Sequence, residues 1–153
     1  MEKYKEAVKE FINNFTNHQI INYEDLVLIK EDIYLPNKEQ KEFIKLGNIR
    51  GVGTRIGQIN KDKFTPSFQL IDLIKTNKII ILNEKMEFLF LCGRDIFKQS
   101  VEQKIHGEGL FIIQNKSKEN LGIGLIRNKE DKIIKNIIDR GFFLRREKNE
   151  KRN

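Results

Sequence analysis

The chain has 153 residues, of which 39% are hydrophobic and 33% charged, and this balance predicts a folded protein and excludes a disordered one. This length suits one domain or two small units, so a large enzyme with an appended module is excluded. The apolar runs are too short to span a bilayer, and residues 1–15 lack the apolar core of a signal peptide. We therefore expect a soluble, cytoplasmic protein without a membrane partner.

The net charge of +7 is unevenly distributed. Residues 1–77 hold 12 Lys and Arg against 11 Asp and Glu, whereas residues 78–153 hold 17 against 11. Clustered cations attract phosphates and release their counterions, which favours a nucleic-acid partner for the second half. An A+T-biased genome or an idle, solvated basic tail would produce the same excess, so charge alone leaves both explanations open.

An amphipathic helix and a β-hairpin are predicted at the start of the chain. Apolar side chains recur at helical spacing between Glu2 and Phe15, so one helix face should pack on a core. Residues 26–29 and 33–35 are short β-like runs on either side of a Lys-Glu-Asp turn, which predicts a hairpin.

A capped helix should follow the hairpin. Asn37 can cap it, and Gln40 occupies the third position, as in a capping box. The helix is expected to run through Leu46 and to bury Phe43, Ile44 and Leu46 as one stripe.

Residues 51–57, Gly-Val-Gly-Thr-Arg-Ile-Gly, superficially resemble a nucleotide-binding loop. The third glycine is one residue late for G-x-G-x-x-G, and no Gly-Lys-Ser/Thr follows. A strand with glycines at points of close backbone approach is the better interpretation. A small nucleotide-binding enzyme stays an alternative, for which Gly53→Val should abolish nucleotide binding. A helix from Ser67 through Thr76 then completes an α/β unit with antiparallel strands.

The second half predicts a glycine-punctuated β module. It follows residues 76–78, which contain no Gly/Ser/Pro linker, so we place a domain boundary after residue 77. A short helix is expected to open at residues 93–97, and the pairs Ile133-Ile134 and Ile137-Ile138 supply a further apolar segment. Strands are predicted at residues 79–82, 86–91, 110–113, 121–126 and 138–146, the last of them basic.

The cysteine, histidine and aspartate residues of the sequence do not predict a metal site or a catalytic site. One cysteine and two histidines cannot form a four-ligand zinc site, and Cys92 is expected to be a small buried residue at a strand end. Asp139 has no accompanying acid or base, so we expect it to accept backbone hydrogen bonds around Gly141. The chain is predicted to have no catalytic residue, no metal and no cofactor.

Short motifs of the second half resemble those of PUA domains, the RNA-binding modules named after pseudouridine synthases and archaeosine transglycosylases. Residues 93–97 resemble the glycine and acidic helix opening, and residues 121–124 the small-residue strand. The closing Asp-x-Gly-x-x-Leu-Arg pattern is matched by Asp139, Gly141, Leu144 and Arg145.

The whole chain resembles the Nip-seven-like ribosome-biogenesis factors. The first half contributes Gly53-Thr54, Gly57, Phe64 and the helix before residue 78. The resemblance implies an α+β fold, in which an α/β pre-PUA domain with antiparallel strands packed on helices, residues 1–77, precedes a PUA β-barrel-like domain, residues 78–153.

The function implied by this resemblance is non-catalytic RNA binding, as an rRNA-binding assembly factor of the large ribosomal subunit. Its partners would be precursor rRNA and other assembly factors, with no small-molecule substrate. In PUA domains RNA lies between the short helix and nearby strands. The matching positions are Arg94 and Lys98 on the helix and Arg145 and Arg146 on the last strand, with Arg140, Lys148 and Arg152 as auxiliary contacts to the RNA backbone.

Two questions stay open. Strand alternation would direct only one of Arg145 and Arg146 at the RNA, and would bury one of Phe142 and Phe143 while leaving the other able to stack on a base. The chain could instead be an RNA-binding accessory subunit of an RNA-modifying enzyme, such as a tRNA transglycosylase or an rRNA modification complex. An acidic patch on the first half, docking the catalytic partner, would indicate that role.

Overall fold

A computed structural model of the chain divides into two compact units, Met1–Lys75 and Thr76–Asn153, which we call the N-terminal and C-terminal units. The structure describes residues 1–150, without the side chains of Phe143 and residues 147–150. Each unit contains its own hydrophobic cluster, and the mixed α+β architecture is as predicted. None of the helices within the described residues has the length and apolar character needed to cross a bilayer.

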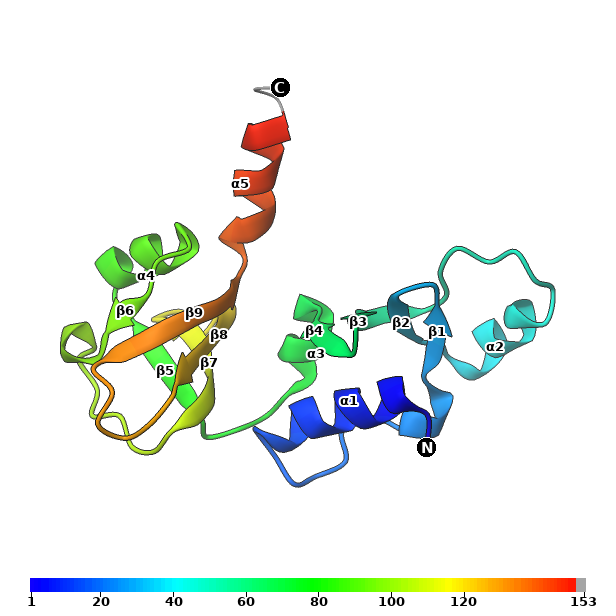
Figure 1. The fold of residues 1–153 in the computed structure, drawn as a ribbon, viewed down its shortest axis with the longest axis horizontal. Coiled ribbons are helices and arrows are strands. Elements are labelled where there is room, and N and C mark those ends of the chain that lie inside the picture. The colour runs from blue at the N-terminus through cyan, green and yellow to red at the C-terminus, as the bar shows by residue number, and fades with distance from the viewer. Residues whose placement is uncertain (151–153) are drawn as a thin grey trace. The chain divides into compact units, whose positions relative to one another are not determined.

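The N-terminal unit is built on an antiparallel sheet of order β1-β2-β3-β4, with α1 packed on β4 and α3 on β3 (Figure 1). Its elements are α1 (Lys3–Asn13), the 3-10 helix η1 (Tyr23–Asp25), β1 (Val27–Ile29), β2 (Asp32–Leu35), α2 (Lys38–Ile44), β3 (Thr54–Asn60), β4 (Lys63–Pro66) and α3 (Phe68–Leu73).

Several local predictions for this unit are confirmed. The first helix is amphipathic, with Val8 and Ile12 completely buried. Asn37 and Gln40 form the predicted capping box, in which each side chain accepts a hydrogen bond from the other residue's backbone N–H. At Gly57 a Cβ atom would lie 2.4 Å from the Thr65 carbonyl oxygen, so the strand does need glycine at a close approach.

The predicted buried stripe of α2 is wrong. Phe43 is 59% exposed and Leu46 is 78% exposed. The cause is competition for the core, because α1, the strands and α3 fill this unit's hydrophobic cluster without any side chain from α2. The capping box therefore specifies where this helix starts but not which of its faces is buried.

The C-terminal unit is a curled half-barrel sheet of order β5-β7-β8-β9-β6, in which β5 and β7 are parallel and the other pairs antiparallel (Figure 1). Its elements are β5 (Ile79–Leu82), α4 (Glu84–Leu91), β6 (Ile96–Phe97), the 3-10 helix η2 (Lys98–Ser100), β7 (Gly109–Asn115), β8 (Asn120–Ile126), β9 (Ile133–Asp139) and α5 (Gly141–Glu150).

Three predicted elements of this unit have the wrong secondary structure. Residues 86–91 belong to the helix α4, which begins where the Asn83 side chain accepts the backbone N–H of Met86. Residues 93–97 form a turn and the strand β6 instead of a helix. The expected last strand ends at Asp139, and α5 follows it. The strands predicted around residues 79–82, 110–113 and 121–126 are confirmed.

Candidate nucleic-acid interface

The junction between β9 and α5 is held by an ion pair. Asp139, the last residue of β9, is only 3% exposed. Arg145 Nη1 donates to Asp139 Oδ1 at 2.9 Å and Nη2 to Oδ2 at 3.0 Å, so the pair is bidentate. These hydrogen bonds raise the pKa of the Arg145 guanidinium above its ordinary value. Asp139 therefore binds a side chain, and not the backbone around Gly141 as predicted.

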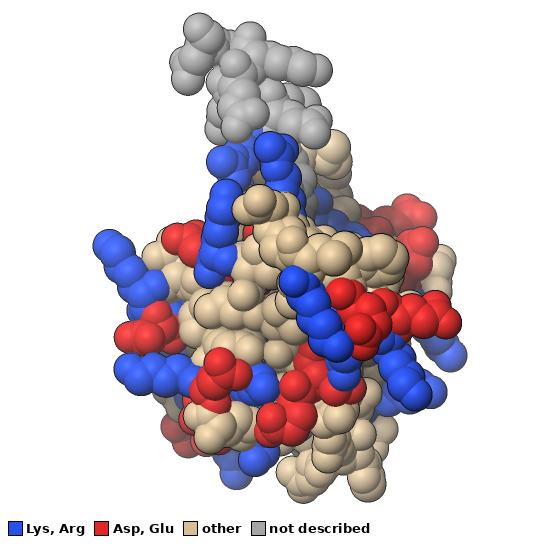
Figure 2. Space-filling view, turned by 90° about the vertical axis from the view of Figure 1, so that its right-hand side faces the viewer, with Lys and Arg blue, Asp and Glu red and all other residues tan. Residues whose placement is uncertain are grey.

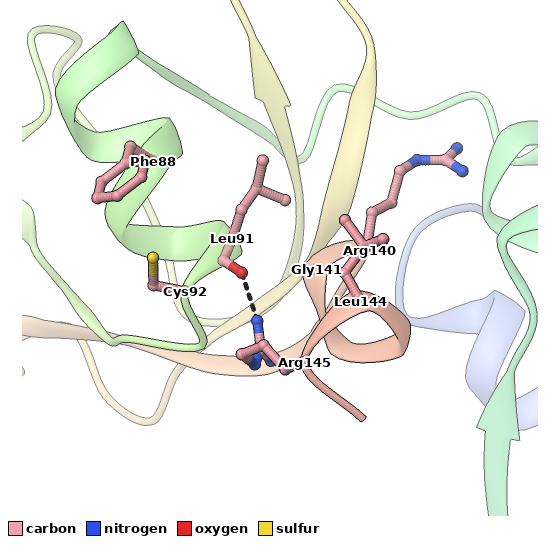
Figure 3. A pocket seen from close by; sticks show the side chains of 7 residues that line it. All are labelled: Phe88, Leu91, Cys92, Arg140, Gly141, Leu144 and Arg145. Carbon is pink, nitrogen blue, oxygen red and sulfur yellow. Dashed lines mark hydrogen bonds between the residues drawn. The ribbon is translucent and has the colours of Figure 1, made fainter. Parts of the chain in front are cut away.

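Arg145 also ties α5 to the end of α4. Its Nη1 donates to the Leu91 carbonyl oxygen as well (Figure 3). Two glycines make this approach possible. A Cβ atom on Gly93 would lie 2.9 Å from Arg145 Nη2, and one on Gly141 would lie 1.9 Å from the Leu91 oxygen. One guanidinium thus joins β9, α4 and α5.

A mostly apolar hollow of about 560 Å³, which we call the α4–α5 groove, lies beside this junction. Phe88 on α4 is 68% exposed and Leu144 on α5 is 65% exposed. Figure 3 shows Phe88 and Cys92 on the α4 side, with Arg140 pointing away from Arg145. The groove is lined by Phe88, Leu91, Cys92, Arg140, Gly141, Leu144 and Arg145.

Cys92 is exposed in this groove, so its predicted burial is wrong. It caps the C-terminal end of α4 and does not end a strand. No group of three or more His, Cys, Asp or Glu able to hold a metal occurs in the described part of the chain.

Two of the arginines predicted to contact RNA, Arg140 and Arg146, lie at the junction between β9 and α5. Arg146 follows Arg145 on α5, where successive side chains are rotated by about 100°, so Arg145 turns inward while Arg146 is exposed. Arg140 lies in the turn before α5, is exposed, and donates from Nε to the Asn120 carbonyl oxygen at 2.6 Å. The strand alternation predicted for the two consecutive arginines does not apply, because α5 is a helix.

Arg94 is exposed in the turn between α4 and β6 instead of on a helix. The turn is anchored on β9, because Asp95 Oδ1 accepts the backbone N–H of Asn136 at 2.8 Å and Asn136 Nδ2 donates to the Phe90 carbonyl oxygen at 2.8 Å. Gly93, with a φ of +84°, supplies the left-handed conformation at which α4 ends. Arg94 therefore projects from a rigid turn next to the residue that contacts Arg145.

Lys98 does not belong to this group. It lies on η2, beyond β6, and its Nζ donates to the Lys129 carbonyl oxygen at 3.1 Å. β6 pairs with the opposite end of β9, where Phe97 lies across from Ile133. Six residue steps along β9 correspond to about 20 Å, so the predicted site is divided into two places.

Some predicted residues cannot be placed. The Lys148 side chain and Arg152 lie outside the described residues, as does the Phe143 side chain. Phe142 is 49% exposed on the first turn of α5. Figure 2, viewed from the side of α2 and β1, shows basic side chains among acidic ones, several of which gather right of centre.

Sequence reasoning missed the apolar lining of the groove. Phe88, Leu91 and Cys92 are spaced three and four residues apart, as are Gly141, Leu144 and Arg145, which is the spacing of one helix face. The spacing can be read from the sequence, but it predicts a shared apolar face only when both segments are interpreted as helices.

Known proteins with similar structures support the fold. A conserved PUA domain protein of Thermoplasma acidophilum superposes with a TM-score of 0.56 at 15% identity, covering 96% of each chain. A hypothetical protein of Pyrococcus horikoshii superposes with a TM-score of 0.51 at 18% identity, covering 88% of this chain and 90% of that one. At these identities the likeness concerns the fold alone.

Sequence comparison identifies the family. The family described as UPF0113 PUA domain matches residues 78–148, which confirms the predicted PUA resemblance and indicates RNA binding in general terms. A UPF0113 protein of Archaeoglobus fulgidus is 31% identical over 131 residues, 78% of this chain and 75% of that protein. One of Aeropyrum pernix is 30% identical over 122 residues, 76% of this chain and 70% of that protein. The chain therefore belongs to the UPF0113 family.

Proposed function

We propose that this protein binds RNA without catalysing a reaction, and that its C-terminal unit holds the RNA along the α4–α5 groove. One observation carries the proposal. The segment that matches a PUA domain, residues 78–148, contains an apolar groove beside which exposed arginines lie. The same half of the chain, residues 78–153, carries 17 Lys and Arg against 11 Asp and Glu. This surface suits an anionic, partly aromatic ligand.

The chemistry of the groove fits RNA in two ways. Arg94, Arg140 and Arg146 are exposed, and a planar guanidinium can bind phosphate through two hydrogen bonds or stack on a base. Phe88, 68% exposed on the groove wall, offers an aromatic face to an unpaired base. Arg145 stays in the proposed contact set because its side chain is 37% exposed, with Asp139 fixing its position.

We further propose that the RNA is precursor rRNA and that the protein assists assembly of the large ribosomal subunit in the cytoplasm, together with other assembly factors. The support is the order of the two units, because an α/β unit followed by a PUA domain resembles the Nip-seven-like factors. Residues 1–77 would then be the pre-PUA domain and residues 78–153 the PUA domain.

The binding proposal can be tested by fluorescence anisotropy with a labelled single-stranded RNA at several salt concentrations. The affinity should fall steeply with salt. Arg140→Ala/Arg146→Ala should weaken binding about tenfold and reduce the slope of log K against log salt by about 2. Arg50→Ala/Lys75→Ala is a matched control, because it removes the same charge from exposed positions of the N-terminal unit. Equal losses in the two variants would contradict a site at the groove.

A further inference from the structure

A second hollow, of about 630 Å³, lies at the other end of β9. We call it the Phe97 pocket. It is formed between the β6–η2 segment and the β8–β9 loop, and it is lined by Phe97, Lys98, Gln99 and residues 129–133. It lies about 20 Å from the α5 end of β9, so it is separate from the α4–α5 groove.

The floor of the Phe97 pocket is apolar and open to solvent. Phe97 on β6 pairs directly with Ile133 on β9 in the antiparallel ladder, so their side chains lie on one face of the sheet. Phe97 is 55% exposed and Ile133 is 38% exposed. An aromatic ring held on a strand and open to solvent offers a flat, rigid surface to a planar ligand.

The rim of the pocket is held in place by the backbone. The backbone N–H of Lys98 donates to the Lys132 carbonyl oxygen at 2.9 Å, while Lys98 Nζ donates to the Lys129 carbonyl oxygen at 3.1 Å. These two bonds tie η2 to the β8–β9 loop. The pocket therefore exists before any ligand binds, which reduces the entropy cost of binding.

The charges on this rim favour an anion. Lys129 and Lys132 are exposed, and within residues 1–150 neither takes part in an ion pair. Asp131 Oδ1 accepts the backbone N–H of Ile133 at 3.3 Å, so this carboxylate is engaged within the loop. The lining of the pocket therefore contains three lysines, Lys98 included, and two acidic residues, Glu130 and Asp131.

We propose that the Phe97 pocket is a second RNA contact, which receives an unpaired base stacked on Phe97 while Lys129 and Lys132 face the neighbouring phosphates. This inference rests on the proposed function and extends it. A ring flanked by lysines suits single-stranded nucleic acid, because every base has a face that stacks and every phosphate carries a charge. A base inside a duplex cannot reach the ring, so the second contact selects RNA with an unpaired segment long enough to span both places.

The test compares Phe97→Leu with Phe43→Leu in the full chain. Phe43 is 59% exposed on α2, so its replacement removes an equally exposed ring from the other unit. Anisotropy is measured with a single-stranded RNA of about 12 nucleotides, within the usual range of such sites, and with the same strand annealed to its complement. Phe97→Leu should weaken single-strand binding about tenfold and leave duplex binding unchanged. Phe43→Leu should change neither.

A second variant covers the case in which Phe97→Leu disturbs the short strand β6. Lys129→Ala/Lys132→Ala changes only exposed side chains and should reduce the salt slope by about 2. If both variants bind like wild type while Arg140→Ala/Arg146→Ala is weakened, the second contact is overturned and the proposed function stands. If the wild-type chain binds no RNA, the proposed function itself is overturned, and the second contact with it.

Discussion

The two ends of β9 use positive charge in different ways. At the C-terminal end, Arg145 is drawn into the fold by the buried Asp139 carboxylate and by the Leu91 carbonyl oxygen. At the N-terminal end, Lys129 and Lys132 remain exposed around the Phe97 pocket. A basic side chain of this unit therefore has a structural role where a buried acceptor binds it, and is available to a ligand where it stays exposed.

Arg145 and Arg146 show the same contrast between adjacent residues. One is held by a carboxylate that is 3% exposed, and the other is exposed on the outer side of α5. Arg145 should therefore act mainly on stability and Arg146 mainly on binding. A double substitution of Arg145 and Arg146 would combine a loss of stability with a loss of binding, so the two residues are best replaced one at a time.

The largest expected effect is the loss of stability in Arg145→Ala. Removal of the guanidinium leaves the buried Asp139 carboxylate without this partner, which costs about 3–5 kcal/mol for a fully buried pair. Since the Arg145 side chain is 37% exposed, solvent screening reduces this, and we expect about 2–3 kcal/mol in the free energy of unfolding. Urea denaturation measures this loss of unfolding free energy. Arg146→Ala, the matched control, should change stability by less than about 0.5 kcal/mol. Equal losses in the two variants would contradict the different roles assigned to the two arginines.

Gly141→Ala should cost about 2 kcal/mol, because the new Cβ would lie 1.9 Å from the Leu91 backbone oxygen and would push α5 away from α4. Gly107→Ala is the control. Gly107 has a φ of +91° but no atom within 4 Å of a Cβ position, so only backbone strain of about 1 kcal/mol is expected there. Thermal unfolding of the two variants separates crowding from strain, and a smaller loss at Gly141 than at Gly107 would argue against the close approach.

The smallest expected effect concerns a half-buried ion pair, Lys41 with Asp25, which contrasts with the pair of Arg145 and the buried Asp139 carboxylate. The hydrogen bond from Lys41 holds the pKa of Asp25 below its ordinary value of 3.8. Because the pKa of the folded state is lowered, the pair adds stability above the ordinary value, and this is lost as the pH falls through the lowered pKa. Lys41→Met should raise the Asp25 pKa in an NMR titration. An unchanged pKa would show that the pair does not persist in solution.

Local signals in the sequence predicted much of the fold. Side-chain caps such as Asn37 with Gln40, and the β-branched runs of β5, β7 and β8, were interpreted correctly because neighbouring residues determine them. The run from Phe88 to Leu91 failed, because a short apolar stretch fits a strand and a buried helix equally well. The Asn83 cap was the local signal that distinguishes them.

The site was less predictable than the fold. Arg94 and Arg146 were predicted as RNA contacts from motif and charge, but their surroundings depend on contacts distant in sequence, such as the Arg145 guanidinium against Gly93. Lys98 was grouped with them because it is close in sequence to Arg94. The pairing of β6 with the N-terminal end of β9 places Lys98 away from the β9–α5 junction, and no local pattern encodes that pairing.

The most direct test of the central claim, that the C-terminal unit binds RNA, is ultraviolet crosslinking of the folded chain to single-stranded RNA, with the attached peptides identified by mass spectrometry. The account predicts crosslinks in the segments 88–98 and 140–146, which contain the groove residues and exposed arginines. Crosslinks confined to residues 1–75 would contradict it, as would the absence of crosslinks under conditions that label an RNA-binding control protein.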